Sequence, residues 1–184
     1  MVRAPERVPG ALGVGAAAAP SVERAWWKAL AEAFSARAAG VKLALLDPAC
    51  DDRPVVTFDD HIRRYADHRH AASTAFLDAS PVRTGFDSVP PLEGEDADAW
   101  LEGLCRRIEA AGSSAYAVDV TAPDVAELGL VVARVVAPEL CSLDTAHAAR
   151  FLGGRRLYES AAALGLRAGT IGEGDLNPDP HPFP

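Results

Sequence analysis

Residues 115–136 read AYAVDVTAPDVAELGLVVARVV and contain the two clearest strand signals of the chain. Residues 115–120 alternate in side-chain character, as a strand with two different faces does. Residues 129–136 form a nearly continuous apolar run rich in valine, which predicts a strand buried on both faces. The residues between the two runs, from Thr121 to Val125, predict a short cap and turn. A β-sheet therefore lies at the centre of the expected fold.

Helical patterns surround this strand pair. Ser21 predicts the N-cap of a helix that ends near Ala39, where Gly40 would close it. Apolar residues recur along this helix at three- and four-residue spacing. Further on, the sequence predicts a short strand at Val55–Thr57 and a helix from Asp59 or Asp60 to about Leu77. It also predicts a helix at 96–111 with an apolar buried face. Residues 144–164 are predicted to be helical, with a break at Gly153–Gly154. The fold class is therefore α/β or α+β, with a small β-sheet layered with helices.

The composition predicts a globular protein and excludes several kinds of partner. The 184 residues are 49% apolar and 24% charged, and the formal net charge is −8. This acidic balance disfavours binding to nucleic acid or to an anionic membrane surface. The sequence contains no uninterrupted apolar run of about 18 residues that could span a membrane. The three cysteines, Cys50, Cys105 and Cys141, lack metal-ligand spacing and predict reduced thiols in a cytoplasmic protein.

The C-terminal residues 177–184 have proline at every second position from Pro178 to Pro184. Such a pattern forbids helix and strand pairing and favours a stiff, extended segment. A stiff segment can enter a groove and place its terminal carboxylate reproducibly, because it has little conformational entropy to lose. The alternative is a frayed chain end, which composition alone favours.

Two features near the N-terminus could contact phosphate. Gly13 and Gly15 precede the first helix and could present backbone amides to an anion. They fit neither a Walker motif nor a complete Gly-x-Gly-x-x-Gly pattern, so a close-packed turn is the favoured interpretation. On the helix, Glu32 and Arg37 could supply a metal ligand and a phosphate contact, or could simply belong to its solvated face.

Three histidines predicted on the second helix, His61, His68 and His70, raise the possibility of a metal site. His61 and His68 share a helical face with Tyr65. They are interleaved with three arginines whose positive charge opposes a bound cation, so we interpret the face as solvated and charged. The arginines are Arg63, Arg64 and Arg69.

Five motifs occur in an order that is specific as a set. They are AWWKALAEAFSAR at 25–37, TFDDHIRRYA at 57–66, DVTAPDV at 119–125 followed by GLVVARVVAP at 129–138, RFLGGRRL at 150–157, and the alternating prolines at 180, 182 and 184. In this order they resemble the YcaO family, specifically the ATP-dependent cyclodehydratases that make thiazolines and oxazolines in ribosomal peptides.

The resemblance implies a chemistry and roles for particular residues. Such enzymes bind ATP and magnesium without a Walker motif and use ATP to phosphorylate a peptide amide oxygen during ring closure. By resemblance, Glu32 is a nucleotide-site or magnesium carboxylate and Arg37 a phosphate contact. Pro180, Pro182 and Pro184 form the tail that reaches the catalytic centre. With the family in view, the tail at 175–184 is expected to be ordered and functional, so that residues added beyond Pro184 would abolish cyclisation.

The departures from the family pattern limit what the chain is expected to do alone. We find no counterpart of the glutamate-rich segment that supplies most magnesium ligands in the family's first half. Ser35 stands where glutamine is usual, and Glu139 where glycine often follows the proline. Residues 1–184 are therefore expected to be the C-terminal half of a YcaO domain, either a fragment or part of a site completed by another polypeptide.

The expected partners follow from the same resemblance. They are a precursor peptide, a leader-peptide-binding protein and an N-terminal YcaO half, with ATP and magnesium as cofactors. The alternative function is a non-catalytic or truncated YcaO-like scaffold that binds a partner without turning over ATP. Thioamide or amidine formation shares the ATP chemistry, but the proline tail favours azolines.

Overall fold

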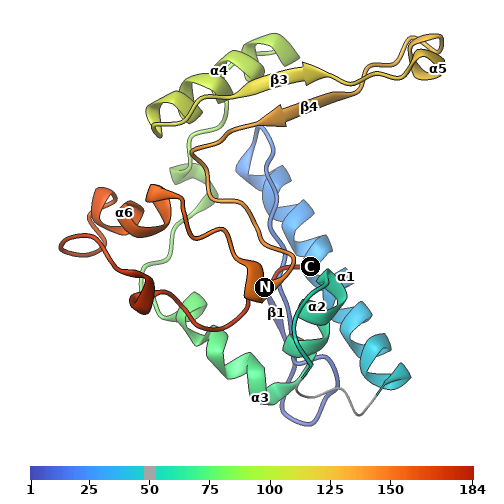
Figure 1. Ribbon diagram of the computed structural model, residues 1–184, viewed down its shortest axis with the longest axis vertical. Helices are drawn as coiled ribbons and strands as arrows, with labels where there is room; N and C mark the ends of the chain where they lie inside the picture. Colours follow the sequence, from blue (N-terminus) through green and yellow to red (C-terminus); the bar gives the residue numbers. More distant parts are fainter. Residues whose placement is uncertain (48–52) are drawn as a thin grey trace. The chain divides into compact units, whose positions relative to one another are not determined.

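The computed structural model describes residues 1–47 and 53–184, so the expectation for Cys50 lies outside the described residues. The chain divides into two compact units (Figure 1). Unit 1 comprises the described residues of 1–91 with 144–150 and 177–184, and unit 2 comprises 92–143 and 151–176. Helices and two small antiparallel sheets make up these units, which confirms the α+β fold class. Within the described ranges, no helix has the length and apolar character needed to cross a membrane.

Unit 1 is organised around one long helix. Strands β1 and β2 pair antiparallel, and both contact helix α1, as does helix α2 (Figure 1). The elements are β1 (Val2–Arg3), β2 (Leu12–Gly13), α1 (Val22–Leu46), α2 (Phe58–Ala66), α3 (His68–Ala71) and the 3₁₀ turns η1 (Ala72–Asp78), η2 (Phe86–Ser88) and η3 (His147–Ala149).

Helix α1 begins where the sequence predicts and ends later. Ser21 is its N-cap, and the Ser21 hydroxyl accepts a hydrogen bond from the backbone N–H of Arg24 at 3.3 Å. The predicted end at Gly40 was wrong, because the helix continues to Leu46. Gly40 is buried, and a Cβ added there would lie 2.9 Å from the Cβ of Ala66 on α2. This glycine therefore serves a close helix crossing rather than a helix end.

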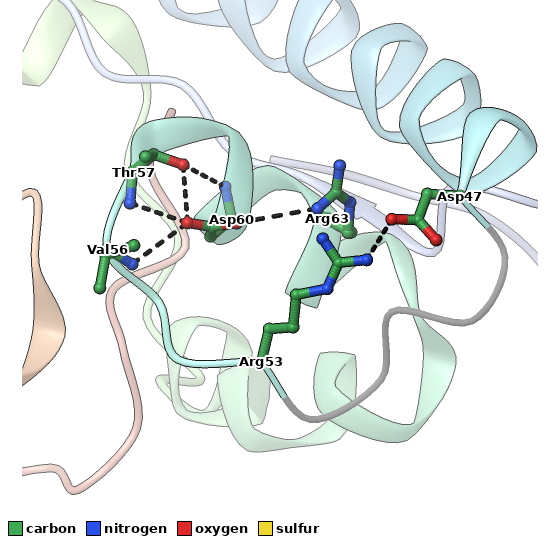
Figure 2. Close-up of polar contacts among 6 residues, drawn as sticks. All are labelled: Asp47, Arg53, Val56, Thr57, Asp60 and Arg63. Carbon is green, nitrogen blue, oxygen red and sulfur yellow. Dashed lines mark hydrogen bonds and ion pairs between the residues drawn. The ribbon is translucent and has the colours of Figure 1, made fainter.

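The N-terminus of α2 is held by a capping box. The Thr57 hydroxyl accepts from the backbone N–H of Asp60 at 3.2 Å, and the Asp60 carboxylate accepts from the backbone N–H of Thr57 at 2.9 Å. The same carboxylate accepts from the backbone of Val56, and its other oxygen lies 3.7 Å from Nη1 of Arg63 (Figure 2). The cap is thus Thr57 and not an aspartate, and Asp60 closes the box three residues later.

The continuous helix predicted to reach Leu77 was also wrong. Helix α2 ends at Ala66, because Asp67 has an extended backbone and caps the short α3. The chain before α2 is anchored by an ion pair between Arg53 and Asp47 (Figure 2). The predicted strand at Val55–Thr57 was wrong, since these residues form no strand, and the carbonyl of Val55 accepts from the backbone N–H of His147 at 2.9 Å.

The capping box predicts an acid-dependent contribution to stability. Burial acts to raise the pKa of Asp60, but hydrogen bonds from Thr57 and from the backbone outweigh it and hold the pKa below 3.8. A carboxyl with a lowered folded-state pKa stabilises the protein above its unfolded-state pKa and loses this effect as the pH falls through the folded-state value. We expect Asp60→Asn to cost about 1 kcal/mol at neutral pH, and this cost to disappear as acid protonates the carboxyl of the folded protein.

The measurement is urea unfolding of the wild type and the variant over a pH series. Asp59→Asn removes the same charge from the next residue and is the matched control, expected to change stability by less than about 0.5 kcal/mol. A cost for Asp60→Asn that does not change with pH would contradict the role given to the ionised carboxylate.

Unit 2 contains the strand pair that the sequence located. Strands β3 (Tyr116–Asp119) and β4 (Ala133–Val136) pair antiparallel, with Tyr116 opposite Val136. The unit's helical elements are α4 (Ala97–Ala110), α5 (Pro123–Ala126), α6 (Arg155–Ala163) and the 3₁₀ turn η4 (Glu173–Asp175). Of the helical residues predicted at 144–164, only η3 and α6 form.

The burial predicted for unit 2 was wrong. Val131 and Val135 are 75% and 64% exposed, although the run at 129–136 predicts a strand covered on both faces. On α4 the expected buried face is also open, since Leu101 and Leu104 are both exposed. The physical reason is that this sheet has only two strands in the described part of the chain. Its valines are typical of a strand inside a larger, covered sheet, but no layer of the described residues covers them.

Candidate functional site

An N-terminal segment, residues 9–16, lies directly against α1 in unit 1. A Cβ added at Gly13 would lie 2.2 Å from the carbonyl oxygen of Ala33, and one at Gly15 would lie 2.2 Å from that of Ala29. Both distances are far below a van der Waals contact, so only glycine permits this approach. The close-packed interpretation of these glycines is confirmed.

Glu32 and Arg37 both contact this segment, at different ends. The Glu32 carboxylate accepts a hydrogen bond from the backbone N–H of Ala16 at 2.7 Å. The Arg37 guanidinium donates from Nε to the carbonyl of Gly10 at 2.9 Å and from Nη2 to the carbonyl of Pro9 at 3.1 Å. The two side chains therefore hold the two ends of residues 9–16, although they lie about 140° apart on an ideal helix.

The chemistry of Glu32 fits a single magnesium ligand. Its side chain is exposed, and the bond from Ala16 uses one carboxylate oxygen, Oε2. Magnesium is usually held by one or two carboxylates together with phosphate oxygens and waters. In the described ranges, no group of three or more His, Cys, Asp or Glu residues could hold a metal ion. Glu32 can therefore contribute to such a site, and the other ligands must come from elsewhere.

The proline-alternating tail is fixed along α2. The Tyr65 hydroxyl donates to the carbonyl of Pro180, and Arg64 forms an ion pair with Asp179 at 3.3 Å. Pro180 is buried, whereas Pro182 and Pro184 are half-buried. Arg150 also donates to the carbonyl of Asn177 at 3.0 Å. The tail is thus held on unit 1 by contacts at Asn177, Asp179 and Pro180.

His61 is fully buried, at 0% exposure, which corrects the interpretation of this face as solvated. Tyr65, one turn further along α2, is buried as well, at 2%. Of the arginines that suggested a wet surface, Arg63 and Arg64 are only half-buried, whereas Arg69 is exposed. The sequence pattern did not reveal this buried face, because the three arginines around His61 and Tyr65 give the helix a polar character. The signal that could have found it is the four-residue spacing of His61 and Tyr65.

Residues 144–147 pack next to the tail and contact His61 of α2 and His181 of the tail. Nε2 of His61 lies 2.9 Å from the carbonyl oxygen of Thr145, and Nε2 of His181 lies 2.7 Å from that of Asp144. Burial is the main cause that lowers the pKa of His181, and also that of His147. Both rings are therefore neutral at pH 7.

The core of unit 1 joins the tail to the N-terminal segment. Leu12 and Val14 are buried in a cluster with Tyr65, and Phe183 of the tail packs against this cluster. Gly13 and Gly15, on either side of Val14, contact α1 instead. One face of residues 9–16 therefore touches the helix that carries Glu32 and Arg37, and the other touches the cluster on which the tail packs.

Cys105 is half-buried and Cys141 is exposed, and both belong to unit 2. Their expected reduced state stays a prediction.

A family model matches most of the chain. Residues 1–141 match the family model described as "YcaO cyclodehydratase, ATP- and Mg²⁺-binding". The matched range includes Glu32, Arg37 and α2, whereas residues 144–150 and the tail at 177–184 lie beyond it. No curated protein matches the chain.

A solved structure, that of the heterocyclase TruD, has a similar fold. The two chains share 24% sequence identity and superpose with a TM-score of 0.63. The similarity covers 92% of this chain and 20% of the TruD chain. The present chain thus spans about a fifth of the length of the structure that it resembles, and the likeness concerns the fold.

Proposed function

This chain belongs to the YcaO cyclodehydratase family, and on that premise we propose that it supplies part of an ATP-dependent site that forms azoline rings in a ribosomal precursor peptide. The proposal is for the C-terminal half of such a domain, spanning residues 1–184. The observation that carries it is the arrangement in unit 1, where residues 9–16 join Glu32 and Arg37 on one face to the tail cluster on the other.

The proposed reaction joins a side chain of the peptide to its own backbone. The thiol or hydroxyl of a Cys, Ser or Thr residue attacks the carbonyl carbon of the preceding amide and loses its proton. The resulting oxyanion attacks the γ-phosphate of ATP and releases ADP. The C–O bond then breaks with loss of phosphate while the nitrogen loses its proton, and a C=N bond closes the thiazoline or oxazoline ring.

Each candidate residue has a role in this proposal. Glu32 would hold magnesium through its carboxylate, and the metal would supply positive charge opposite the phosphates. Arg37 has two of its three guanidinium nitrogens on the backbone of residues 9 and 10, which fixes its plane for a phosphate contact. The tail, with Pro180, Pro182 and Pro184, places its end at the catalytic centre, where its carboxylate positions a group for proton transfer.

The proposed partners supply what the described residues lack. Because no metal-binding cluster forms in those residues, a second polypeptide with the glutamate-rich first half of the family domain would complete the magnesium site. A leader-peptide-binding protein would deliver the precursor peptide. We place this assembly in the cytoplasm, where ATP is available.

A specific observation favours a second function, a non-catalytic scaffold. Glu32 and Arg37 already bind the chain's own backbone and hold residues 9–16 on α1. Side chains with this structural task can persist in a protein that binds a partner and no nucleotide.

Calorimetric titration with ATP and magnesium separates the two functions. We expect binding by the chain mixed with an N-terminal YcaO half, and Glu32→Gln should weaken it about tenfold or more, because one charged metal ligand is lost. Glu23→Gln, an exposed position in the first turn of the same helix, is the matched control and should bind as the wild type does. Equal affinity for Glu32→Gln and Glu23→Gln would leave the scaffold as the better proposal.

A further inference from the structure

His61 of α2 connects two segments that are far apart in the sequence. Its Nδ1 atom lies 2.8 Å from the carbonyl oxygen of His181 in the tail. Its Nε2 atom lies 2.9 Å from the carbonyl oxygen of Thr145. The side chain is completely buried, so water cannot replace either partner.

The chemistry of these partners specifies where the hydrogens are. A carbonyl oxygen only accepts hydrogen bonds, and a ring nitrogen donates one only when it carries a hydrogen. A neutral imidazole carries hydrogen on only one ring nitrogen. The lone pair of the other nitrogen would then face a carbonyl oxygen at hydrogen-bond distance. Both contacts of His61 are hydrogen bonds only when both nitrogens carry hydrogen. A buried unsatisfied pair of this kind is costly, so the doubly protonated ring is the form that fits.

The neighbouring ring is suited to a positively charged His61. The rings of His61 and His181 are stacked, with centroids 3.8 Å apart and planes inclined by 11°. Burial lowers the pKa of His181, and its Nε2 donates to the carbonyl of Asp144. A neutral imidazole therefore lies flat on the His61 ring, and two like charges are avoided.

We propose that His61 is a positioning residue that, with a hydrogen on both ring nitrogens, fastens the proline-alternating tail to residues 144–147. The bond to His181 sets the position of the last four tail residues, and the bond to Thr145 fixes the ring that makes it. The ionisable groups around this contact are Arg64 and Tyr65 of α2, Asp179 and His181 of the tail, and Asp144, His147 and Arg150 of the neighbouring segment.

The partners of the two acidic residues in this set explain why the His61 ring contacts backbone carbonyl oxygens rather than a carboxylate. Asp179 is paired with Arg64. Asp144 contacts the tail through its carbonyl oxygen. The consequence for catalysis rests on the proposed function, since an undocked tail could not reach a catalytic centre. The fastening itself can be measured without ATP or substrate.

The first test is nitrogen NMR of the histidine rings in the full chain. We expect both ring nitrogens of His61 to carry a bound hydrogen at neutral pH, while His181 carries one on Nε2 alone. A neutral His61 with a single ring hydrogen would overturn the proposal. This readout needs no variant and would not be changed by a merely structural role of the side chain.

The second test follows the tail itself. His61→Phe keeps a flat ring for stacking but has no donor, and the amide signals of the three non-proline residues after Pro178 should then move to random-coil positions and sharpen. His68→Phe is the matched control, because His68 lies against the carbonyl of Val8 at 2.9 Å and not against the tail. The tail residues observed are Asp179, His181 and Phe183.

The tail should stay ordered in the wild type and in His68→Phe. A tail that stays ordered in His61→Phe with α-helix content intact would overturn the fastening role, while leaving ATP binding, and so the proposed function, unaffected.

Discussion

Gly15→Ala is expected to lower the free energy of unfolding by about 3 kcal/mol, since overpacking a tight site costs about 1–3 kcal/mol and here the obstacle is backbone. The added Cβ would lie 2.2 Å from the carbonyl oxygen of Ala29 and 2.7 Å from the backbone nitrogen of Ala33. Both atoms belong to the backbone of α1, so neither can move away by a side-chain rotation. The segment must move off α1, and the hydrogen bond from Ala16 to Glu32 is then lost as well.

Urea unfolding compares this variant with Gly153→Ala, whose added Cβ has no atom within 4 Å. The control should change stability by less than about 0.5 kcal/mol. ATP–magnesium binding by the mixture with an N-terminal half should fall with Gly15→Ala, because Glu32 loses its orienting contact. Similar stabilities for the two variants would show that residues 9–16 are not packed on α1 as closely as described.

Tyr65→Ala is expected to cost about 3–5 kcal/mol, as removal of a buried aromatic ring generally does. The ring is 2% exposed and packs with Leu12 and Val14 at the centre of the unit 1 core. Its loss would open a cavity between the N-terminal segment and Phe183 of the tail. Thermal unfolding of the variant should show the loss directly.

Tyr65→Phe isolates the hydroxyl contribution of the same residue. The Tyr65 hydroxyl donates to the carbonyl of Pro180, and burial is the main cause that raises the pKa of Tyr65 above 10.0. The phenol therefore remains a neutral donor across the physiological range. We expect Tyr65→Phe to cost about 1–2 kcal/mol, because the buried carbonyl loses its partner.

Tyr158→Phe is the control for this smaller change. Tyr158 donates to the carbonyl of Leu152 at 2.7 Å within unit 2, so the same atom is removed at a site away from the tail. Tail amide signals should change in Tyr65→Phe and remain unchanged in Tyr158→Phe. Unchanged tail signals in both variants would contradict the assignment of Tyr65 as a tail contact.

Sequence reasoning predicted most of the features that depend on neighbours along the chain. Alternation and valine content located β3 and β4, and Ser21 was identified as a cap because its hydroxyl serves an amide only three residues away. The alternating prolines predicted an extended tail, since proline restricts its own backbone whatever surrounds it. The order of the motifs also identified the family, and residues 1–141 match its model.

Burial was predicted less well, because it depends on what packs against an element. The pattern of β4 is that of a covered strand, yet its valines are exposed in a two-stranded sheet. The pattern around His61 is that of a wet surface, yet this side chain is completely buried under the tail and residues 144–147. Periodicity tells which residues share a face, but it does not tell what that face meets.

The sequence by itself determined the family, the α+β class, the strand pair and the stiffness of the tail, all of which follow from local backbone preference and motif order. Only the tertiary structure decided that residues 9–16 join Glu32 to Arg37, that Gly40 lies within a helix crossing, and that His61 fastens residues more than a hundred positions away. These contacts form between segments remote in the chain, and their partners are set by packing geometry rather than by any preference of the residues themselves.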